Sequence, residues 1–413
     1  MNADNIVVAG AGPAGMMAAI RAAQLHREVI LVDKNPVLGK KLLLSGKGRC
    51  NLTNFCDLDE FLKRFSGRGE FLRDAFKKLF NRELMLFFER RGLKLKVERQ
   101  LRVFPSTDSS LSVVKAMEKE LKERGVRVIL RSALKDVFMR DNRIKGVSLT
   151  TGNIAADKLI LATGGISFSF TGSTGEGLDL ARKLGHKVTA LKAGLVPLVT
   201  RQGYPELLEG LTLKNIRLNF SDGKRQLRSD IGELLFTADG ISGPLVLSLS
   251  GRIIDWLSQS GTLHVEIDLK PALSKEQLEG RLLREFKLNP KKTVKSALKA
   301  LLPLRMVDVF MDLAGISREK KTSQAAQEER RRLVCLLKAF RMDIAGSRPI
   351  NEAMITRGGI SLKDIDPRTM QSRVIKGLYF AGEIIDIDAD TGGFNLQAAF
   401  STGYLAGESA AMN

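Results

Sequence analysis

Cysteine and histidine are scarce in this chain of 413 residues. The three cysteines are odd in number and scattered, which excludes a disulfide-stapled scaffold and favours the reducing cytoplasm. The three histidines, His26, His186 and His264, lie far apart, and no spacing of ligand residues is typical of a metal site. We therefore expect a cytoplasmic protein that holds no metal ion.

Long apolar runs are also missing. No uninterrupted apolar stretch approaches the ~20 residues that a membrane-spanning helix needs, so we expect no membrane association. The apolar segment 6–20 lacks a basic leader and contains glycines and a proline, so it predicts a strand, a turn and a helix start rather than a signal peptide. The apolar content of 44% is that of a folded globular protein, and the length predicts two or three domains.

Acidic residues are too few to balance the basic ones, which gives a formal net charge of +20. The excess is regional, because residues 61–103 carry 13 Lys and Arg against 5 acidic residues, and residues 286–341 carry 14 against 5. Residues 377–413 carry five acidic residues and no Lys or Arg. Such basic segments form either a solubilising surface or the footprint of a polyanion, for which RNA is the leading candidate.

A glycine-rich turn, Gly10-Ala-Gly-Pro-Ala-Gly15, follows an apolar segment and precedes an Ala-rich helical pattern. This strand, turn and helix arrangement is typical of a dinucleotide site. The first glycine permits the tight turn, the second lets the backbone approach a pyrophosphate, and the third lets helix and strand pack closely. A carboxylate at the end of the second predicted strand, 28–32, can bind ribose hydroxyls. The candidate contacts at this end are Gly10, Gly12, Ala14, Gly15, Asp33 and Lys34.

A second glycine-rich run extends from Gly377 to Gln397. It contains an apolar strand, a Gly-Glu turn and the start of the last helix, which is typical of the segment that covers a flavin ring. The helix N-terminus would present amides to the edge of the ring where negative charge gathers on reduction. With the strand 158–162 and the glycine turn after it, these segments predict bound FAD. The candidate contacts here are Lys41, Thr163, Gly164, Gly165, Gly382, Glu383, Asp390, Gly393, Phe394, Asn395 and Leu396.

No second unit of strand, GxGxxG turn and helix follows the first. The segment Gly172-Ser-Thr-Gly-Glu-Gly177 is rich in glycine but does not follow an apolar strand, so it predicts a loop against FAD or substrate. A dedicated NAD(P)H domain is therefore not expected. Either NAD(P)H, as electron donor, visits the flavin face transiently, or the electrons come from another donor.

The character of the chain changes near residue 191 and changes back near residue 345. Between them lie short alternating strand patterns and then basic helical patterns, which begin with a capping box at Ser274 and Gln277. We therefore predict an α/β, Rossmann-like fold of the two-dinucleotide-binding-domain flavoprotein type. The predicted parts are a discontinuous FAD-binding domain, 1–190 and 345–413, an inserted β subdomain, 191–272, and a small basic helical subdomain, 273–344.

The loop from Gly46 to Asn54 combines small residues with hydrogen-bond donors. The small residues admit a ligand closely, and Arg49 and the amide side chains can bind it. Cys50 is either a proton donor beside the flavin or a packed, small thiol. We keep both interpretations of Cys50.

Together these motifs resemble the YhiN/BaiN-like family of FAD-dependent oxidoreductases, which are NAD(P)/FAD-dependent flavoproteins. The resemblance covers essentially the whole chain and implies an FAD domain with an inserted β-barrel-like domain and a small helical domain. The matching segments are GAGPAG, the run from Lys41 to Asn54 with its GRCNLTN end, RVFP at 102–105, ATGGISF with GSTGEG, SGP at 242–244, TRGGI at 356–360 and the closing GLYFAGEIIDIDADTGGFNLQ.

Two positions depart from the pattern of this family. The segment before Ser-Gly-Pro usually reads Phe-Thr-His-x-Gly, and here Ala238 replaces the histidine. If that histidine protonates substrate in the family, Asp239 or Cys50 has to supply the proton here. The candidate catalytic residues are therefore Cys50, Asp239 and Arg49, the last through a bound water. Lys47 stands where small or polar residues are common, which makes the site more cationic.

The resemblance implies an FAD-dependent reductase of a conjugated C=C bond, and three functions stay open. Some members are linked to reduction of unsaturated carbonyl compounds, and others to reduction of uridine to dihydrouridine in large-subunit ribosomal RNA. The basic excess favours the ribosomal RNA reaction, with RNA bound through segments 61–103 and 286–341. The alternatives are an NAD(P)H-dependent flavin reductase of small unsaturated carbonyl compounds and an FAD-stabilised RNA-binding or ribosome-assembly factor.

Overall fold

The computed structural model describes residues 5–25 and 27–413, so residues 1–4 and His26 lie outside the described part. Backbone packing divides the chain into two compact units. Unit 1 is Met1–Gly194 with Pro349–Asn413, and unit 2 is Leu195–Arg348. Both predicted inserted subdomains, 191–272 and 273–344, fall largely in unit 2, and their separation from each other stays a prediction.

Unit 1 is built on a parallel sheet whose strands are short apolar runs. Its strand order is β20-β10-β1-β2-β6, and every pairing in it is parallel. The chain starts in the middle, moves outward through β2 to β6, and then adds β10 and β20 on the other side of β1, which is the Rossmann order. The bounds are β1 Asn5–Ala9, β2 Glu28–Val32, β6 Arg127–Ile129, β10 Lys158–Leu161 and β20 Leu378–Phe380.

Helices α1, Pro13–Gln24, and α13, Phe394–Met412, pack against each other along small residues. A Cβ added at Gly403 would lie 2.2 Å from the carbonyl oxygen of Ala14, and one at Gly407 would lie 2.3 Å from that of Ala18. Gly403 and Gly407 are four residues apart in α13, as are Ala14 and Ala18 in α1, so each helix presents its two residues on one face. The helix backbones are therefore in direct contact.

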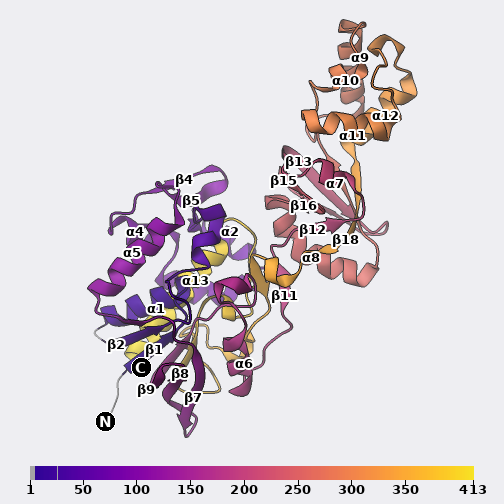
Figure 1. The fold of residues 1–413 in the computed structure, drawn as a ribbon. Helices are drawn as coiled ribbons and strands as arrows, with labels where there is room; N and C mark the ends of the chain where they lie inside the picture. Colours follow the sequence, from indigo (N-terminus) through magenta and orange to yellow (C-terminus); the bar gives the residue numbers. More distant parts are fainter. Residues whose placement is uncertain (1–4, 26) are drawn as a thin grey trace. The chain divides into compact units, whose positions relative to one another are not determined.

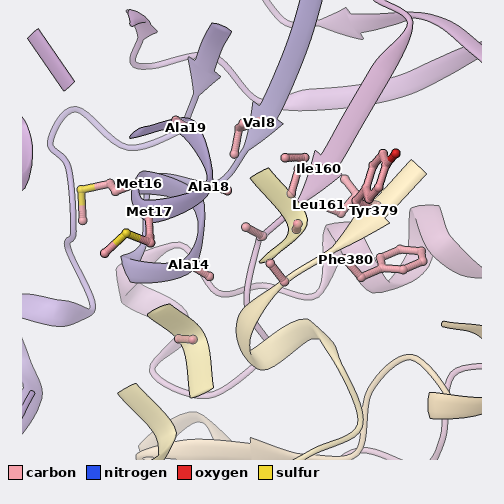
Figure 2. Close-up of a cluster of buried hydrophobic side chains, with 14 of the residues drawn as sticks. Val8, Ala14, Met16, Met17, Ala18, Ala19, Ile160, Leu161, Tyr379 and Phe380 are labelled. Carbon is pink, nitrogen blue, oxygen red and sulfur yellow. The ribbon is translucent and has the colours of Figure 1, made fainter. Parts of the chain in front are cut away.

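The core of unit 1 is shared by the two ends of the chain. Tyr379 and Phe380 of β20 are fully buried, as are Ile160 and Leu161 of β10. Figure 2 shows these side chains in one cluster with residues of β1 and α1. Burial of this apolar surface holds the first and last segments together. The labelled members of the cluster from β1 and α1 are Val8, Ala14, Met16, Met17, Ala18 and Ala19.

Alanine at Gly403 is expected to lower the free energy of unfolding by about 1–3 kcal/mol, the usual cost of overpacking. Its Cβ has no room beside Ala14. The matched control is alanine at Gly280 in α9, Lys275–Leu288, where the nearest atom to a new Cβ is a guanidinium nitrogen of Arg284 at 3.8 Å. That exchange is expected to raise the free energy by about 0.4–1 kcal/mol. Chemical denaturation measures both values, and equal stabilities would contradict the close helix contact.

Unit 1 also contains smaller antiparallel sheets. The crossover from β6 to β10 is the three-stranded sheet β7-β8-β9, which Figure 1 shows as one group of strands. The other sheets are β3-β5-β4 and β11-β19. The strand bounds are β3 Thr53–Asn54, β4 Leu95–Val97, β5 Arg102–Pro105, β7 Leu134–Arg140, β8 Arg143–Leu149, β9 Gly152–Ala155, β11 Lys192–Gly194 and β19 Ile355–Arg357. The remaining helices are α2 Leu58–Lys63, α3 Arg73–Lys78, α4 Asn81–Glu89, α5 Ser110–Glu123 and α6 Glu176–Lys183.

Unit 2 begins with a closed antiparallel sheet. Its strands follow the order β14-β13-β15-β16-β12-β18-β17, and β17 also pairs with β13, so the ring of pairings closes. The long strand β13 makes this closure because its first half pairs with β15 and its second half with β17. The bounds are β12 Leu198–Thr200, β13 Thr212–Ser221, β14 Gln226–Arg228, β15 Gly232–Thr237, β16 Gly240–Ser242, β17 His264–Asp268 and β18 Phe340–Ser347.

The helices of unit 2 share one buried core with this sheet. Figure 1 shows α9 to α12 as a single group. Helix α9 begins where predicted, because Ser274 and Gln277 form the reciprocal hydrogen bonds of a capping box. The bounds are α7 Tyr204–Leu207, α8 Pro244–Ser260, α9 Lys275–Leu288, α10 Val294–Leu298, α11 Leu304–Ala314 and α12 Gln327–Lys338.

Candidate cofactor and active site

The first glycine turn is tightly packed at two of its three glycines. Gly10 has a φ of +103°, which glycine adopts readily, and its amide donates to the carbonyl oxygen of Val32 at 2.8 Å. A Cβ at Gly10 would lie 2.4 Å from the carbonyl oxygen of Ala162, and one at Gly15 would lie 1.8 Å from that of Gly10. These two positions therefore fix strand, turn and helix against each other.

Gly12 differs from its neighbours because nothing lies near it. An added Cβ would have no heavy atom within 4 Å, and the residue is the N-cap of α1 without a capping side chain. The first amides of α1 are thus free of a side-chain cap at an open place on the backbone. A helix N-terminus of this kind binds phosphate, since the amides and the helix dipole both favour negative charge.

Asp33 joins the end of β2 to the glycine turn. Its Oδ2 accepts from the Ala11 amide at 2.6 Å, and its Oδ1 accepts from the backbone and side-chain nitrogens of Asn35 at 2.7 and 2.9 Å. A carboxylate has about four acceptor positions, so one stays available for a ribose hydroxyl. Asn35 also donates to the carbonyl oxygen of Thr171 at 3.0 Å. The sequence did not identify Asn35, which ties the end of β2 to Thr171, the residue before the loop 172–177.

Lys34, a predicted FAD contact, has protein partners. Its Nζ donates to Thr174 Oγ1 at 2.5 Å and to Glu176 Oε2 at 2.9 Å. These contacts hold the loop 172–177 against the end of β2. The assignment of Lys34 to the cofactor stays a prediction.

A hydrogen-bonded cluster, which we call the clamp, joins four distant segments of unit 1. Glu383 Oε1 accepts from the Thr356 amide at 2.7 Å and from the Ser167 hydroxyl at 3.0 Å. Glu383 Oε2 accepts from Lys41 Nζ at 2.6 Å, and Lys41 also donates to Ser167 at 2.7 Å. Thr356 Oγ1 accepts from the amides of Ile166 and Ser167 at 2.8 and 3.0 Å. The clamp therefore holds the 163–167 turn beside the Gly-Glu turn after β20.

Ser167 and Thr356 were not among the predicted site residues. Thr356 stands in the TRGGI segment, and that motif was the one sequence signal that could have drawn attention to it. Both side chains are almost completely buried. Their contacts span up to 216 residues of sequence, so local spacing does not reveal them.

Two buried polar atoms near these segments have no hydrogen-bond partner within the described ranges. They are Thr163 Oγ1, beside the clamp, and Asn51 Oδ1, in the loop 46–54. Proteins rarely leave buried polar atoms unpaired, so these atoms favour a bound polar ligand. With the open space at Gly12, they fit FAD. Gly12 and the α1 amides would hold its diphosphate, Asp33 its ribose, and Thr163 and Asn51 further polar groups.

The start of α13 is fixed by its own loop. Asn395 Nδ2 donates to the carbonyl oxygen of Ala389 at 2.8 Å, and Asn395 Oδ1 accepts from the Ala389 amide at 2.9 Å. The ring of Phe394 packs edge-on against Phe61 with centroids 4.7 Å apart. A Cβ at Gly393 would lie 2.5 Å from the carbonyl of Thr53. These contacts define the geometry of the segment. The predicted contacts with FAD stay predictions for Asp390, Gly393, Phe394, Asn395 and Leu396.

Arg49 has two carboxylate partners and an aromatic one. Its guanidinium lies 2.5 Å from Glu98 and 2.5 Å from Asp108, and 4.1 Å from the centre of the Phe104 ring. The hydrogen bond to Glu98, followed by that to Asp108, raises the pKa of Arg49. These contacts orient the loop 46–54. The catalytic assignment of Arg49 stays a prediction.

The other two candidate catalytic residues, Cys50 and Asp239, lie in different units. Cys50 belongs to unit 1 and is completely buried, and Asp239 belongs to unit 2. Burial raises the pKa of the Cys50 thiol to about 12, so the thiol stays protonated and is a weak acid. Asp239 Oδ2 lies 3.0 Å from Arg348 Nε, and Asp239 Oδ1 accepts from the Thr237 hydroxyl at 3.2 Å. The catalytic roles of Cys50 and Asp239 stay predictions.

Thiol labelling of the native protein tests the environment of Cys50. At about pH 8, an alkylating reagent is expected to modify the exposed Cys335 while Cys50 stays unmodified until the protein unfolds, because only thiolate reacts. Cys56, whose pKa burial raises to about 11, is expected to react slowly. Peptide mass spectrometry gives the order of modification. Modification of Cys50 as fast as Cys335 would show that the thiol is accessible.

Residues 4–409 match the family model described as the HI0933-like protein Rossmann domain. The chain belongs to this family. Like its HI0933-like relatives, it is an FAD-dependent oxidoreductase with a Rossmann-type α/β fold. The family match confirms the predicted YhiN/BaiN-like resemblance, the fold class and FAD as cofactor.

Named HI0933-like relatives extend over almost the whole chain. A 3-dehydro-bile acid delta(4,6)-reductase of Clostridium scindens is 29% identical over 415 residues and is covered, like this chain, to 99%. A ribosomal RNA dihydrouridine synthase of Haemophilus influenzae is 30% identical over 407 residues, which are 97% of this chain and 96% of the relative.

A solved 3-ketosteroid delta1-dehydrogenase of Sterolibacterium denitrificans shares the fold, with a TM-score of 0.56 and 13% identity. The match covers 99% of this chain and 100% of that structure.

Of the helices described, none is long and apolar enough to cross a membrane. In residues 5–25 and 27–413, no three His, Cys, Asp or Glu side chains are grouped to hold a metal ion. His186 is instead buried beside the Ser372 hydroxyl, 2.7 Å from it, and burial lowers the pKa of the imidazole.

Proposed function

We propose that this protein reduces uridine to dihydrouridine in large-subunit ribosomal RNA. The C5=C6 bond of uracil is conjugated to a carbonyl group, so it accepts hydride at C6 and a proton at C5. Bound, reduced FAD supplies the hydride, with NAD(P)H as the transient source of electrons. The protein must hold the cofactor, admit an unstacked base and deliver the proton.

The distribution of unpaired positive charge carries this proposal. In segment 61–103, most cations have an acidic partner, for example Arg73 with Glu70 and Arg91 with Glu120. The rest have no acidic partner among the described residues, and neither do many in segment 286–341. Such charges bind phosphates, and their number favours a polyanionic substrate. They are Arg82, Arg90, Lys94, Arg99 and Arg102 in unit 1, and Lys287, Lys291, Lys292, Lys299 and Lys321 in unit 2.

The named relatives alone do not choose the substrate. The relative named for ribosomal RNA and the relative named for a bile acid are 30% and 29% identical to this chain. A small steroid-like substrate needs no extended cationic surface, whereas RNA does. The charge distribution therefore favours RNA. A ribosomal substrate would also place the enzyme in the cytoplasm.

Each part of the site has a proposed task. Gly12 and α1 bind the diphosphate of FAD, and the clamp around Glu383 holds the turn 163–167 against the cofactor. Asn51 accepts a hydrogen bond from cofactor or substrate through its unpaired oxygen. Cys50, Asp239 and an Arg49-bound water are the candidates for the proton delivered to C5.

Nucleoside mass spectrometry of purified large-subunit ribosomal RNA tests this function. Cells without the gene are expected to lose a dihydrouridine signal that the wild-type gene restores. The Gly12→Val variant, which blocks the diphosphate, is expected not to restore it, whereas Gly280→Ala, remote from the cofactor motifs in sequence, restores it. An unchanged signal in cells without the gene would refute the proposal.

Reduction of a small unsaturated carbonyl compound is the second candidate. The relative from Clostridium scindens, similar over 99% of this chain, is named for such a reaction. This candidate expects NAD(P)H-dependent turnover of a free enone and RNA binding that is weak even at low salt. Steady-state assays with purified, FAD-loaded protein distinguish the two.

A further inference from the structure

A hollow of about 420 Å³ opens on the surface of unit 1. Its volume falls within the ~300–1,000 Å³ of small-molecule sites. Two of the side chains that line it are aromatic, Phe55 and Phe80, and one is a cation, Arg82. The lining residues are Phe55, Cys56, Asp57, Phe80, Asn81, Arg82 and Glu83.

Phe55 and Arg82 form a pair that a flat ligand can use. The Phe55 side chain is 37% exposed, so part of its ring is open to a ligand. The guanidinium of Arg82 lies 5.6 Å from the centre of the Phe55 ring. The backbone amide of Phe55 donates to the carbonyl oxygen of Leu101 at 2.8 Å, which fixes the main chain at this residue. Aromatic rings and guanidinium planes are the groups on which proteins stack single-stranded bases.

The hollow has one cationic side chain, Arg82, and two carboxylates, Asp57 and Glu83. The two lining carboxylates already accept from backbone amides, Asp57 from Glu60 at 2.9 Å and Glu83 from Phe80 at 3.2 Å. Arg82 has no acidic partner within the described ranges. Arg102, another cation without an acidic partner among the described residues, is the strand partner of Asn54, the residue before Phe55.

The hollow also adjoins the flavin motif. Asn54 Nδ2 donates to the carbonyl oxygen of Gly392 at 3.2 Å, just before α13 begins. On the other side, Phe80 packs edge-on against Phe61 at 5.1 Å, and Phe61 packs against Phe394 at 4.7 Å. A nucleotide in the hollow would therefore lie beside the segment that covers the flavin, as a neighbour of the reacting base must.

We infer that this hollow is a nucleotide subsite, in which Phe55 stacks one unpaired base of the RNA substrate and Arg82 contacts its phosphate. The inference rests on the proposed function and deepens it, because it names a place that receives a nucleotide other than the reduced one. The stack would hold the RNA strand open, so that the target uridine is presented unpaired.

Fluorescence binding measurements on the FAD-loaded full chain test the subsite. The ligand is a single-stranded RNA of about twelve nucleotides that carries 2-aminopurine, whose emission falls when it stacks. Phe55→Ala is expected to weaken binding about 5- to 100-fold and to abolish the emission change, and Phe55→Trp to retain both. Arg82→Gln is expected to reduce the slope of log affinity against log salt by about 0.7. Arg73→Gln, whose arginine is paired with Glu70, is the matched control and is expected to leave affinity unchanged.

The outcomes separate the subsite from the function. Flavin absorbance and thermal unfolding first show that each variant is folded and loaded, and Arg82→Gln replaces Phe55→Ala if the latter is not. Wild-type affinity in both Phe55→Ala and Arg82→Gln, or no binding by the wild type, overturns the subsite. The dihydrouridine signal in cells is measured separately, and its independence from the gene overturns the proposed function instead.

Discussion

Replacing Gly12 with alanine is expected to lower FAD affinity about 10- to 100-fold while leaving the unfolding of the apoprotein unchanged. Gly12 has φ −78° and ψ −176°, which alanine adopts without strain, and an added Cβ meets no protein atom within 4 Å. The methyl group would occupy the space that the diphosphate needs. Titration of the apoprotein with FAD, followed by flavin fluorescence, gives the affinity.

Gly15→Ala gives the contrasting result. Its Cβ would lie 1.8 Å from the Gly10 carbonyl oxygen, so strand and helix have to move apart. We expect the apoprotein to lose about 3 kcal/mol or more of unfolding free energy. If Gly12→Ala destabilised the apoprotein as much as Gly15→Ala, the open space at Gly12 would not be a cofactor site.

Thr356→Val is expected to lower the free energy of unfolding by about 2–5 kcal/mol. Valine has nearly the same shape, but it leaves the amides of Ile166 and Ser167 buried without their acceptor. Each unpaired buried group costs about 1–3 kcal/mol. Because the turn 163–167 then loses its attachment, FAD affinity is expected to fall as well. Denaturation and FAD titration measure the two effects.

Thr200→Val is the matched control for this exchange. Thr200 is 8% exposed, and its Oγ1 is buried with no hydrogen-bond partner in the part of the chain that the structure describes. Removing that hydroxyl is expected to leave stability unchanged or to raise it slightly. If Thr356→Val were as harmless as Thr200→Val, the clamp would contribute nothing to the fold.

Local patterns in the sequence predict those parts of the fold that depend on local geometry. The strand 28–32 and the capping box at Ser274 are found as expected. The glycine turn is equally clear, because all three glycine roles lie within a few residues. Gly10 permits the tight turn, Gly12 leaves room for a phosphate, and Gly15 allows close packing of helix and strand. Family membership then supports FAD as the cofactor.

What the sequence did not predict depends on contacts between distant segments. The net charge of a sequence does not distinguish paired from unpaired cations. Lys34, Arg49 and Arg73 have carboxylate partners. Arg82 has none among the described residues. The acceptor role of Thr356 arises only when the chain returns after unit 2. Residue patterns and spacings within a short segment do not predict such pairings.

The position of β20 and α13 sets the order of events during translation. Unit 2 is one continuous stretch, 195–348, so a nascent chain can complete it while the remainder is still being synthesised. The sheet of unit 1 lacks β20, and α1 lacks its partner helix, until the final segment leaves the ribosome. We therefore expect flavin loading to be a late step, and a polypeptide stalled within unit 2 to lack the cofactor.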